Sequence, residues 1–382
     1  MTPRRIHIAV LDTDVPVPTV YAARGLYSSQ FRVLLQAAAA RLNASGFFPA
    51  NRPVEVRTTA YDVVGGALPH LSLLRTQPRS EANEENGDED RKFGPSGPID
   101  AVLITGSSAS AYRLDRYPWI APLQSFIQTV YAEYPEVRIF GSCFGHQIVA
   151  QALLSRHHPR LKHEVSSSSS SSSNSDSYAY VSVAACPVGY EVGIHPITLN
   201  PAFVRCFPAL ESCLPRQGHG QLQWKLQLIH GDRVTLLSPE LQSDALALPS
   251  PWLNLGSTPK SPIQGLYHPG RVLTYQGHFE FDAWVNRETC IEFARREGWS
   301  ESDIASYLRQ IGPAAAAAPG EEGTTDDDDS KIAAEVVVMF LAGVEGDVDV
   351  DDDKQRISIR ENAVSRNGLI TPPLGDADAE QY

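Results

Sequence analysis

The chain has 382 residues, of which 42% are hydrophobic and 20% are charged, and these are ordinary values for a globular protein that buries its own core. Its net charge of −13 has a local origin, because 18 of the 45 acidic residues fall in windows 81–90, 321–329 and 345–353, which contain no Lys or Arg. The remainder is close to neutral. The composition therefore gives no electrostatic case for binding nucleic acid or an anionic membrane.

The cysteines and the N-terminus bear on the cellular compartment. The five cysteines form an odd set with no CxxC pair, which favours a reducing environment: Cys143, Cys186, Cys206, Cys213 and Cys290. The first apolar stretch is interrupted at Asp12, too early for a signal peptide, and no window approaches the roughly 18 apolar residues of a membrane span. We therefore expect a cytoplasmic protein without a membrane partner.

The N-terminal half predicts alternating strands and helices. Short apolar runs predict strands over 6–11, 54–60, 99–105 and 137–140, and apolar residues at helical spacing predict helices over 31–42 and 119–134. This alternation predicts an α/β fold with an open, mostly parallel sheet that is covered by helices on both faces.

The second half changes character. Strand-like segments at 188–199, 222–229 and 233–237 predict antiparallel additions, and a further strand is expected at 272–275. Helices are expected at about 283–296 and 301–311, the second capped by Ser300 and burying Ile304, Tyr307, Leu308 and Ile311. A last amphipathic helix is predicted from Ile332, Val336, Met339 and Phe340.

Low-complexity segments interrupt the predicted strands and helices without dividing the chain into separate domains. Segments at about 77–98, 165–178 and 313–330 are rich in polar, Ser, Ala, Gly or acidic residues and are interpreted as disordered insertions. Residues 345–382 are interpreted as a disordered acidic tail. The sequence therefore predicts a single domain over residues 1–344.

The strongest chemical signal lies at 139–147, where a strand stops at Gly-x-Cys-x-Gly and continues into an apolar helix. At such a turn a nucleophile stands clear of the sheet, and the glycines permit close backbone packing. The helix N-terminus favours the thiolate and leaves amide N–H groups free for an oxyanion. A buried structural cysteine is the alternative, but it does not explain the glycine spacing. We interpret Cys143 as a nucleophile.

A thiol nucleophile needs a base, and the base needs an orienting acceptor. His278 and Glu280 follow a predicted strand, and their spacing of two in extended chain places both side chains on one side. Alone, His-x-Glu is a weak signal and a solvated loop is the default interpretation. Together with the cysteine turn it predicts a Cys143–His278–Glu280 triad.

These two motifs carry a family resemblance. The segment Gly-Ser-Cys-Phe-Gly-His-Gln at 141–147, with Gly-His-Phe-Glu-Phe at 277–281, resembles the class I glutamine amidotransferase family, whose usual last motif is His-Pro-Glu. Segment 12–27 with Phe31 resembles stand-alone fungal members, and 230–234 resembles the late His-Gly-Asp segment. The resemblance spans about residues 4–312. It implies a flavodoxin-like fold and cleavage of a γ-glutamyl amide through a glutamyl thioester.

The resemblance also assigns roles to single residues. Gly106 and Phe144 would donate backbone N–H groups to the oxyanion, and Gln147 would help to bind the glutamyl group. Segment 188–193 resembles the family stretch near the substrate backbone, with no single contact residue assigned. Phe279 replaces the usual Pro, and Gly-Ser-Ser at 106–108 replaces the commoner Gly-Gly-Pro.

Other titratable residues predict weaker sites. His146 is interpreted as a packing or supporting residue rather than the base. His157, His158 and His163 have no carboxylate or thiol at ligand spacing, and the aspartate runs lack the glycine and terminal Glu of a calcium loop. We expect neither a metal nor a cofactor.

The acceptor of the released amine stays open. No ATP-binding loop appears, so either a separate subunit receives ammonia or the enzyme is a stand-alone hydrolase, similar to the γ-glutamyl peptidases that act on glutathione-like conjugates. The expected substrate is a small γ-glutamyl molecule. A binding or scaffold protein that keeps the fold with little activity is the hypothesis of a different class.

Overall fold

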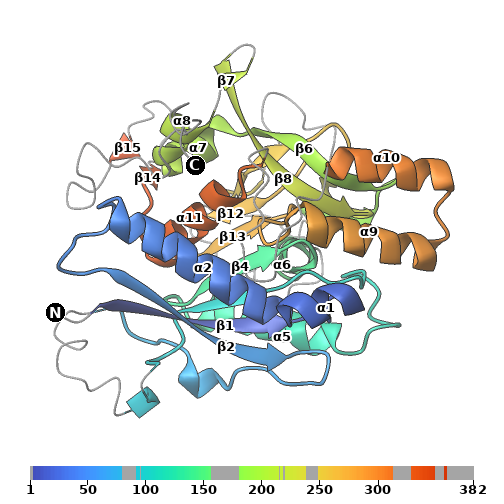
Figure 1. Ribbon diagram of the computed structural model, residues 1–382. Coiled ribbons are helices and arrows are strands. Elements are labelled where there is room, and N and C mark those ends of the chain that lie inside the picture. Colours follow the sequence, from blue (N-terminus) through green and yellow to red (C-terminus); the bar gives the residue numbers. More distant parts are fainter. Residues whose placement is uncertain are drawn as a thin grey trace, which may run out of the picture.

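The computed structural model describes residues 3–79, 92–94, 96–155, 180–214, 216–217, 220–237, 248–312, 328–348 and 357–358. Its centre is a seven-stranded sheet in the order β10-β12-β13-β4-β3-β1-β2 (Figure 1). These strands are β1 (Arg4–Asp12), β2 (Val54–Asp62), β3 (Ala101–Ile104), β4 (Arg138–Ser142), β10 (Leu253–Asn254), β12 (Leu266–His268) and β13 (Val272–Tyr275). The strands from β2 to β13 are parallel, whereas β12 and β10 add antiparallel pairs at one edge.

Helices cover both faces of this sheet. Helices α2 (Tyr27–Ala44) and α11 (Ser330–Leu341) pack on one face against side chains such as Ile8 and Phe140. On the other face, α5 (Ile120–Glu133) and α6 (Phe144–Leu154) pack against side chains such as Leu11. The predicted α/β class, with a mostly parallel sheet and antiparallel additions, is confirmed.

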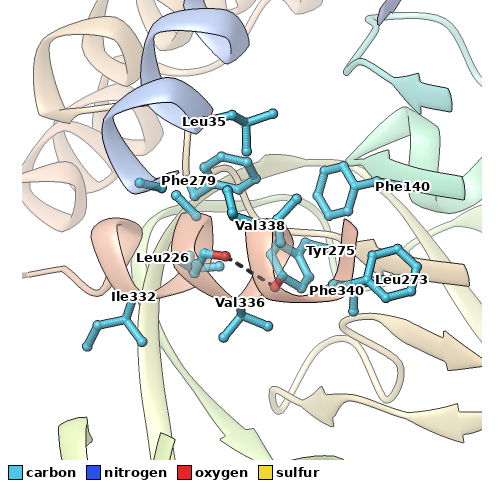
Figure 2. Packing of buried hydrophobic residues seen from close by; sticks show 14 of the residues in the cluster. Leu35, Phe140, Leu226, Leu273, Tyr275, Phe279, Ile332, Val336, Val338 and Phe340 are labelled. Carbon is cyan, nitrogen blue, oxygen red and sulfur yellow. Dashed lines mark hydrogen bonds between the residues drawn. The ribbon is translucent and has the colours of Figure 1, made fainter. Parts of the chain in front are cut away.

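Helix α11 differs from its prediction as an amphipathic helix. Every residue from Ile332 to Leu341 is buried, including Glu335, whose carboxylate accepts a hydrogen bond of 2.6 Å from Arg41 of α2. Figure 2 shows this helix with Leu35 of α2, Leu226 and Tyr275 around it, and the Tyr275 hydroxyl donates to the carbonyl of Ala333 at 3.3 Å. A helix that is apolar on nearly all sides belongs inside the protein.

A second, antiparallel sheet stands beside the first, in the order β11-β6-β8-β7. Its strands are β6 (Glu191–Leu199), β7 (Arg216–Gln217), β8 (Gln221–His230) and β11 (Gly256–Ser257), and helices α9 (Ala283–Glu297) and α10 (Glu301–Ile311) pack against it. Ser300 caps α10 as predicted by accepting from the Asp303 N–H, but of the four side chains expected to be buried only Ile311 is fully buried. The other three are half-buried.

Smaller elements complete the described chain: α1 (Pro18–Arg24), η1 (Leu71–Leu73), α7 (Pro201–Cys206), α8 (Ala209–Cys213), and the strand pairs β5 (Val181–Ala185) with β9 (Asp232–Leu236) and β14 (Asp347–Val348) with β15 (Ile357–Ser358). The predicted insertions and tail lie largely outside the described residues. Glu345, at the start of the predicted tail, accepts a hydrogen bond of 2.9 Å from Tyr267 and pairs with Arg138. Among the described helices, none has the length and apolarity needed to cross a bilayer.

Candidate functional site

Cys143 occupies the sharp turn between β4 and α6. It is the only non-glycine residue with positive φ in the described chain, with φ 50° and ψ −104°, and its thiol-bearing side chain is 6% exposed. Its N–H donates to the Tyr275 carbonyl at 2.8 Å, and its carbonyl accepts from the Gln147 N–H at 3.1 Å. Backbone bonds on both sides therefore hold a conformation that costs about 1–3 kcal/mol.

The flanking glycines explain how the turn closes. A Cβ atom on Gly141 would lie 2.5 Å from the backbone of Gly145, and one on Gly145 would lie 2.3 Å from the carbonyl oxygen of Ile104. Real Cβ atoms do not approach backbone so closely, so the helix can begin directly over β3 and β4 only with glycine at both positions.

Sheet register brings the predicted base to the same edge. Strands β4 and β13 are parallel neighbours, and Tyr275 pairs with Ser142, so the residues that follow both strands emerge together at the carboxyl end of the sheet. His278 Nδ1 lies 2.8 Å from Glu280 Oε1, and the ring stacks on Phe281 with centroids 4.1 Å apart. The three residues predicted as a triad are thus brought together.

Electrostatics favour a charged imidazole. Burial alone would lower the pKa of His278, but attraction to Glu280 and to Cys143 outweighs burial and raises this pKa to about 10. At neutral pH the His278 ring can therefore remain protonated although it is buried. Nδ1 of His278 is hydrogen-bonded to Glu280, which leaves Nε2 as the ring nitrogen that can interact with Cys143.

The predicted oxyanion donors lie next to these groups. A Cβ atom on Gly106 would lie 3.2 Å from His278 Cε1 and 3.6 Å from the Cys143 Cβ, so the Gly106 backbone contacts both residues. Phe144 is the first residue of α6, where N–H groups have no partner within the helix. Within the described chain no hydrogen bond is donated by either N–H.

Known proteins supply an independent comparison. No protein-family profile matches the chain. A glutamine amidotransferase-like protein of Schizosaccharomyces pombe is 27% identical over 279 residues, which are 73% of this chain and 81% of that protein. A Saccharomyces cerevisiae protein named as a glutamine amidotransferase is 30% identical over 187 residues, which are 48% of this chain and 54% of that protein. The chain is therefore similar in sequence to fungal proteins that are named as glutamine amidotransferase-like.

Solved structures include bacterial glutamine amidotransferases. One from Thermotoga maritima aligns with a TM-score of 0.41 and 13% identity, covering 88% of this chain and 96% of that one. Another, from Methylobacillus flagellatus, aligns with a TM-score of 0.40 and 13% identity, covering 89% and 95%.

Two polar residues that sequence patterns did not single out contact the predicted triad residues. Ser142 Oγ donates to Glu280 Oε1 at 2.9 Å, so this oxygen is shared with His278. Gln276 Nε2 lies 3.6 Å from Cys143 Sγ and is fully buried. Both neighbour motif residues in the sequence, and this adjacency was the only signal that could have identified them.

Gln147, predicted to bind the glutamyl group, is hydrogen-bonded to a neighbour of Cys143 in the structure. Its amide nitrogen donates at 3.2 Å both to Gln276 Oε1 and to the carbonyl of Asp232, and its side chain is 3% exposed. In this state Gln147 orients Gln276, which in turn contacts the sulfur of Cys143. Gln147 therefore ties the late His-Gly-Asp segment to the cysteine turn.

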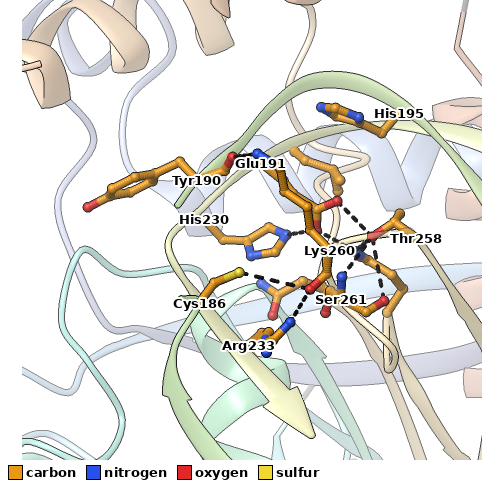
Figure 3. A network of polar contacts seen from close by, with 12 residues as sticks. Cys186, Tyr190, Glu191, His195, His230, Arg233, Thr258, Lys260 and Ser261 are labelled. Atoms are coloured by element: carbon orange, nitrogen blue, oxygen red, sulfur yellow. Dashed lines mark hydrogen bonds and ion pairs between the residues drawn. The ribbon is translucent and has the colours of Figure 1, made fainter. Parts of the chain in front are cut away.

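A buried polar network fills the region of segment 188–193 (Figure 3). Glu191 accepts from Thr258 Oγ1 at 2.7 Å and from Gln264 Nε2 at 3.0 Å, and lies 3.2 Å from His230 Nε2. Burial would raise the pKa of Glu191, but His230 and Thr258 together lower it below its usual range. This carboxylate therefore ties loop 258–264 to β6 and β8.

The remaining histidines do not form a metal centre in the described part of the chain. His146 is buried, bonds Thr274 Oγ1 at 2.8 Å through Nδ1, and has its pKa lowered to about 3 by burial and by nearby His230. It supports the sheet, as predicted. His157, His158 and His163 lie outside the described residues, and the described chain holds no group of three or more metal-ligating side chains.

Proposed function

We propose that this protein hydrolyses a γ-glutamyl amide through nucleophilic catalysis by Cys143. The observation that carries the proposal is the position of Cys143: a thiol on a positive-φ turn lines the same cavity as a histidine that is paired with a buried carboxylate. The relatives named above support an amidotransferase-type reaction, and Gly106 and Phe144 are the proposed oxyanion donors.

The reaction would proceed in two halves. The Cys143 thiolate attacks the carbonyl carbon of the γ-carboxamide, and the resulting oxyanion accepts hydrogen bonds from the Gly106 and Phe144 N–H groups. The C–N bond then breaks as His278 donates its proton to the leaving nitrogen, which departs as ammonia or an amine. In the second half His278 takes a proton from water, the hydroxide attacks the thioester, and glutamate leaves as the thiolate is restored.

Glu280 would act through His278 rather than on the substrate. Its Oε1 accepts the Nδ1–H hydrogen bond, which fixes the ring with Nε2 toward the reacting atoms and stabilises the imidazolium. Ser142 holds the same oxygen in place. Two buried groups thus keep one carboxylate oxygen aligned with the ring.

A γ-glutamyl peptidase is the second candidate within the same chemistry. The cavity that contains Cys143 is small: the space open to the centres of water molecules is about 40 Å³, enough for a few waters or a carboxamide-sized group. A leaving group larger than ammonia would lie outside, so peptides and glutathione-like conjugates are compatible with the site. The same thiol could also release ammonia to a separate subunit. The alternative that the experiment must exclude is a scaffold protein that keeps the fold but does not turn over substrate.

Release of ammonia and glutamate from glutamine and from γ-glutamyl peptides tests the proposal. Unmodified protein should turn over at least one of these compounds, Cys143→Ala should abolish turnover, and Cys186→Ala should retain it. Iodoacetamide should also modify Cys143 well before Cys206 and Cys290, because burial raises the pKa of these two thiols to about 12 and about 11. Absent turnover combined with slow Cys143 alkylation would favour the scaffold.

A further inference from the structure

The mouth of the Cys143 cavity carries one acidic and one basic side chain. Apart from His278, the only charged residues that line it are Asp14, which follows β1, and Arg296, in the last turn of α9. A γ-glutamyl group ends in an α-ammonium and an α-carboxylate, so it offers one charge of each sign. We propose that Asp14 recognises the α-ammonium and Arg296 the α-carboxylate of the substrate, an inference that rests on the proposed γ-glutamyl hydrolysis.

The Asp14 carboxylate is built as a fixed acceptor. Its Oδ2 accepts from the Ser108 N–H at 2.8 Å and from Ser108 Oγ at 2.7 Å, and its Oδ1 accepts from the Val15 N–H at 2.8 Å. No salt bridge joins Asp14 to a basic side chain among the described residues. A carboxylate has about four lone-pair positions, so an ammonium can still bind.

The serines that hold Asp14 are those that depart from the commoner family sequence. Gly-Ser-Ser stands at 106–108, where Gly-Gly-Pro is usual, and a proline at 108 would supply neither the N–H nor the hydroxyl that Asp14 accepts. The departure therefore creates an anchored carboxylate beside the proposed oxyanion glycine. This placement favours recognition of the substrate atoms nearest to the carboxamide chain.

Arg296 has a close internal comparison in Arg295. Both guanidinium groups pair with Glu292, at 3.1 Å for Arg296 Nε and 3.4 Å for Arg295 Nη1. Only Arg296 lines the cavity. Its side chain is 52% exposed, so the guanidinium can leave the helix surface to form a bidentate pair with a carboxylate at the mouth.

Binding to protein that carries Cys143→Ala tests the assignment without turnover. Titration calorimetry would compare L-glutamine with 4-carbamoylbutanoate, which lacks the ammonium, and 4-aminobutanamide, which lacks the carboxylate. Asp14→Asn should weaken the binding of glutamine and of 4-aminobutanamide by about tenfold or more and leave the binding of 4-carbamoylbutanoate unchanged. Arg296→Gln should weaken the binding of glutamine and of 4-carbamoylbutanoate to a similar extent and leave the binding of 4-aminobutanamide unchanged. Arg295→Gln should change none of the three.

The opposite results are equally specific. Equal effects of Arg296→Gln and Arg295→Gln, loss of all three ligands in Asp14→Asn, or no binding of glutamine to the starting protein would each overturn the assignment. Turnover by protein with native Cys143 is measured separately. If the protein hydrolyses a γ-glutamyl amide but the two variants do not show the selective losses of binding described above, the proposed function stands and this inference falls. If the selective losses are seen without hydrolysis, the assignment of Asp14 and Arg296 stands and the proposed function falls.

Discussion

Phe279 lies between His278, the proposed base, and Glu280, its proposed orienting carboxylate, at the position where the class I amidotransferase motif usually has Pro. Its ring is 2% exposed and packs edge-on against Phe31, Phe140 and Tyr275, with centroid distances of 5.4, 5.8 and 6.1 Å. Figure 2 shows it among the residues that surround α11. Phe279 therefore anchors the His-x-Glu loop in the core, and Phe279→Ala should loosen both the core and the site.

The expected cost follows from this packing. Replacing a buried Phe by Ala lowers the free energy of unfolding by about 3–5 kcal/mol, and three aromatic partners place this case near the upper end. The free energy of unfolding of a typical domain is about 5–15 kcal/mol, so the variant should still fold at 25 °C but should have a much lower urea midpoint. Urea unfolding followed by tryptophan fluorescence measures the change.

Phe47→Ala provides a matched control. Phe47 is half-buried and contacts Phe48 with centroids 5.1 Å apart, so its loss should cost no more than about 2 kcal/mol. Equal losses of stability in Phe279→Ala and Phe47→Ala would refute the view that Phe279 anchors the loop.

Three further predictions concern the turn and the triad. Gly145→Ala places a Cβ 2.3 Å from the Ile104 carbonyl and should lower the urea midpoint and abolish turnover together; a stable, active variant would contradict the packing at this turn. Glu280→Gln removes an interaction that raises the pKa of His278 to about 10, so the alkaline fall of kcat/KM should move at least about one unit to lower pH; an unmoved profile would show that Glu280 does not set this pKa. Ser142→Ala should lower kcat about tenfold with little change in KM; a change in KM alone would assign Ser142 to substrate binding instead.

Several strands and helices were predictable because short stretches of sequence mark where they begin and end. Strand β13 at Val272–Tyr275 and helix α10 at Glu301–Ile311 have the predicted bounds, since an apolar run and a capping serine mark them in the sequence. The cysteine turn was also recognisable, because both glycines that it requires lie within two residues of Cys143 in the sequence.

The contacts that complete the site depend on register, which the sequence does not encode locally. Glu191 faces His230 only because β6 and β8 pair in that register, and Gln276 reaches Cys143 only because Tyr275 is opposite Ser142. Helix α11 was misjudged for a different reason. One stripe of apolar residues was recognised, but its unbroken apolar run over 336–341 is the mark of a buried helix.

Because α2 packs against α11, which lies far later in the chain, α2 must wait for this partner during synthesis of the protein. Helix α2 packs against α11, and Arg41 reaches a partner 294 positions later in the chain. At about 5–20 residues per second a ribosome needs about 15–60 s to add that length. Throughout this interval α2 can pack on β1 and β2 but lacks the cover that α11 supplies, so we expect the nascent chain to expose this part of its apolar surface until α11 has been made.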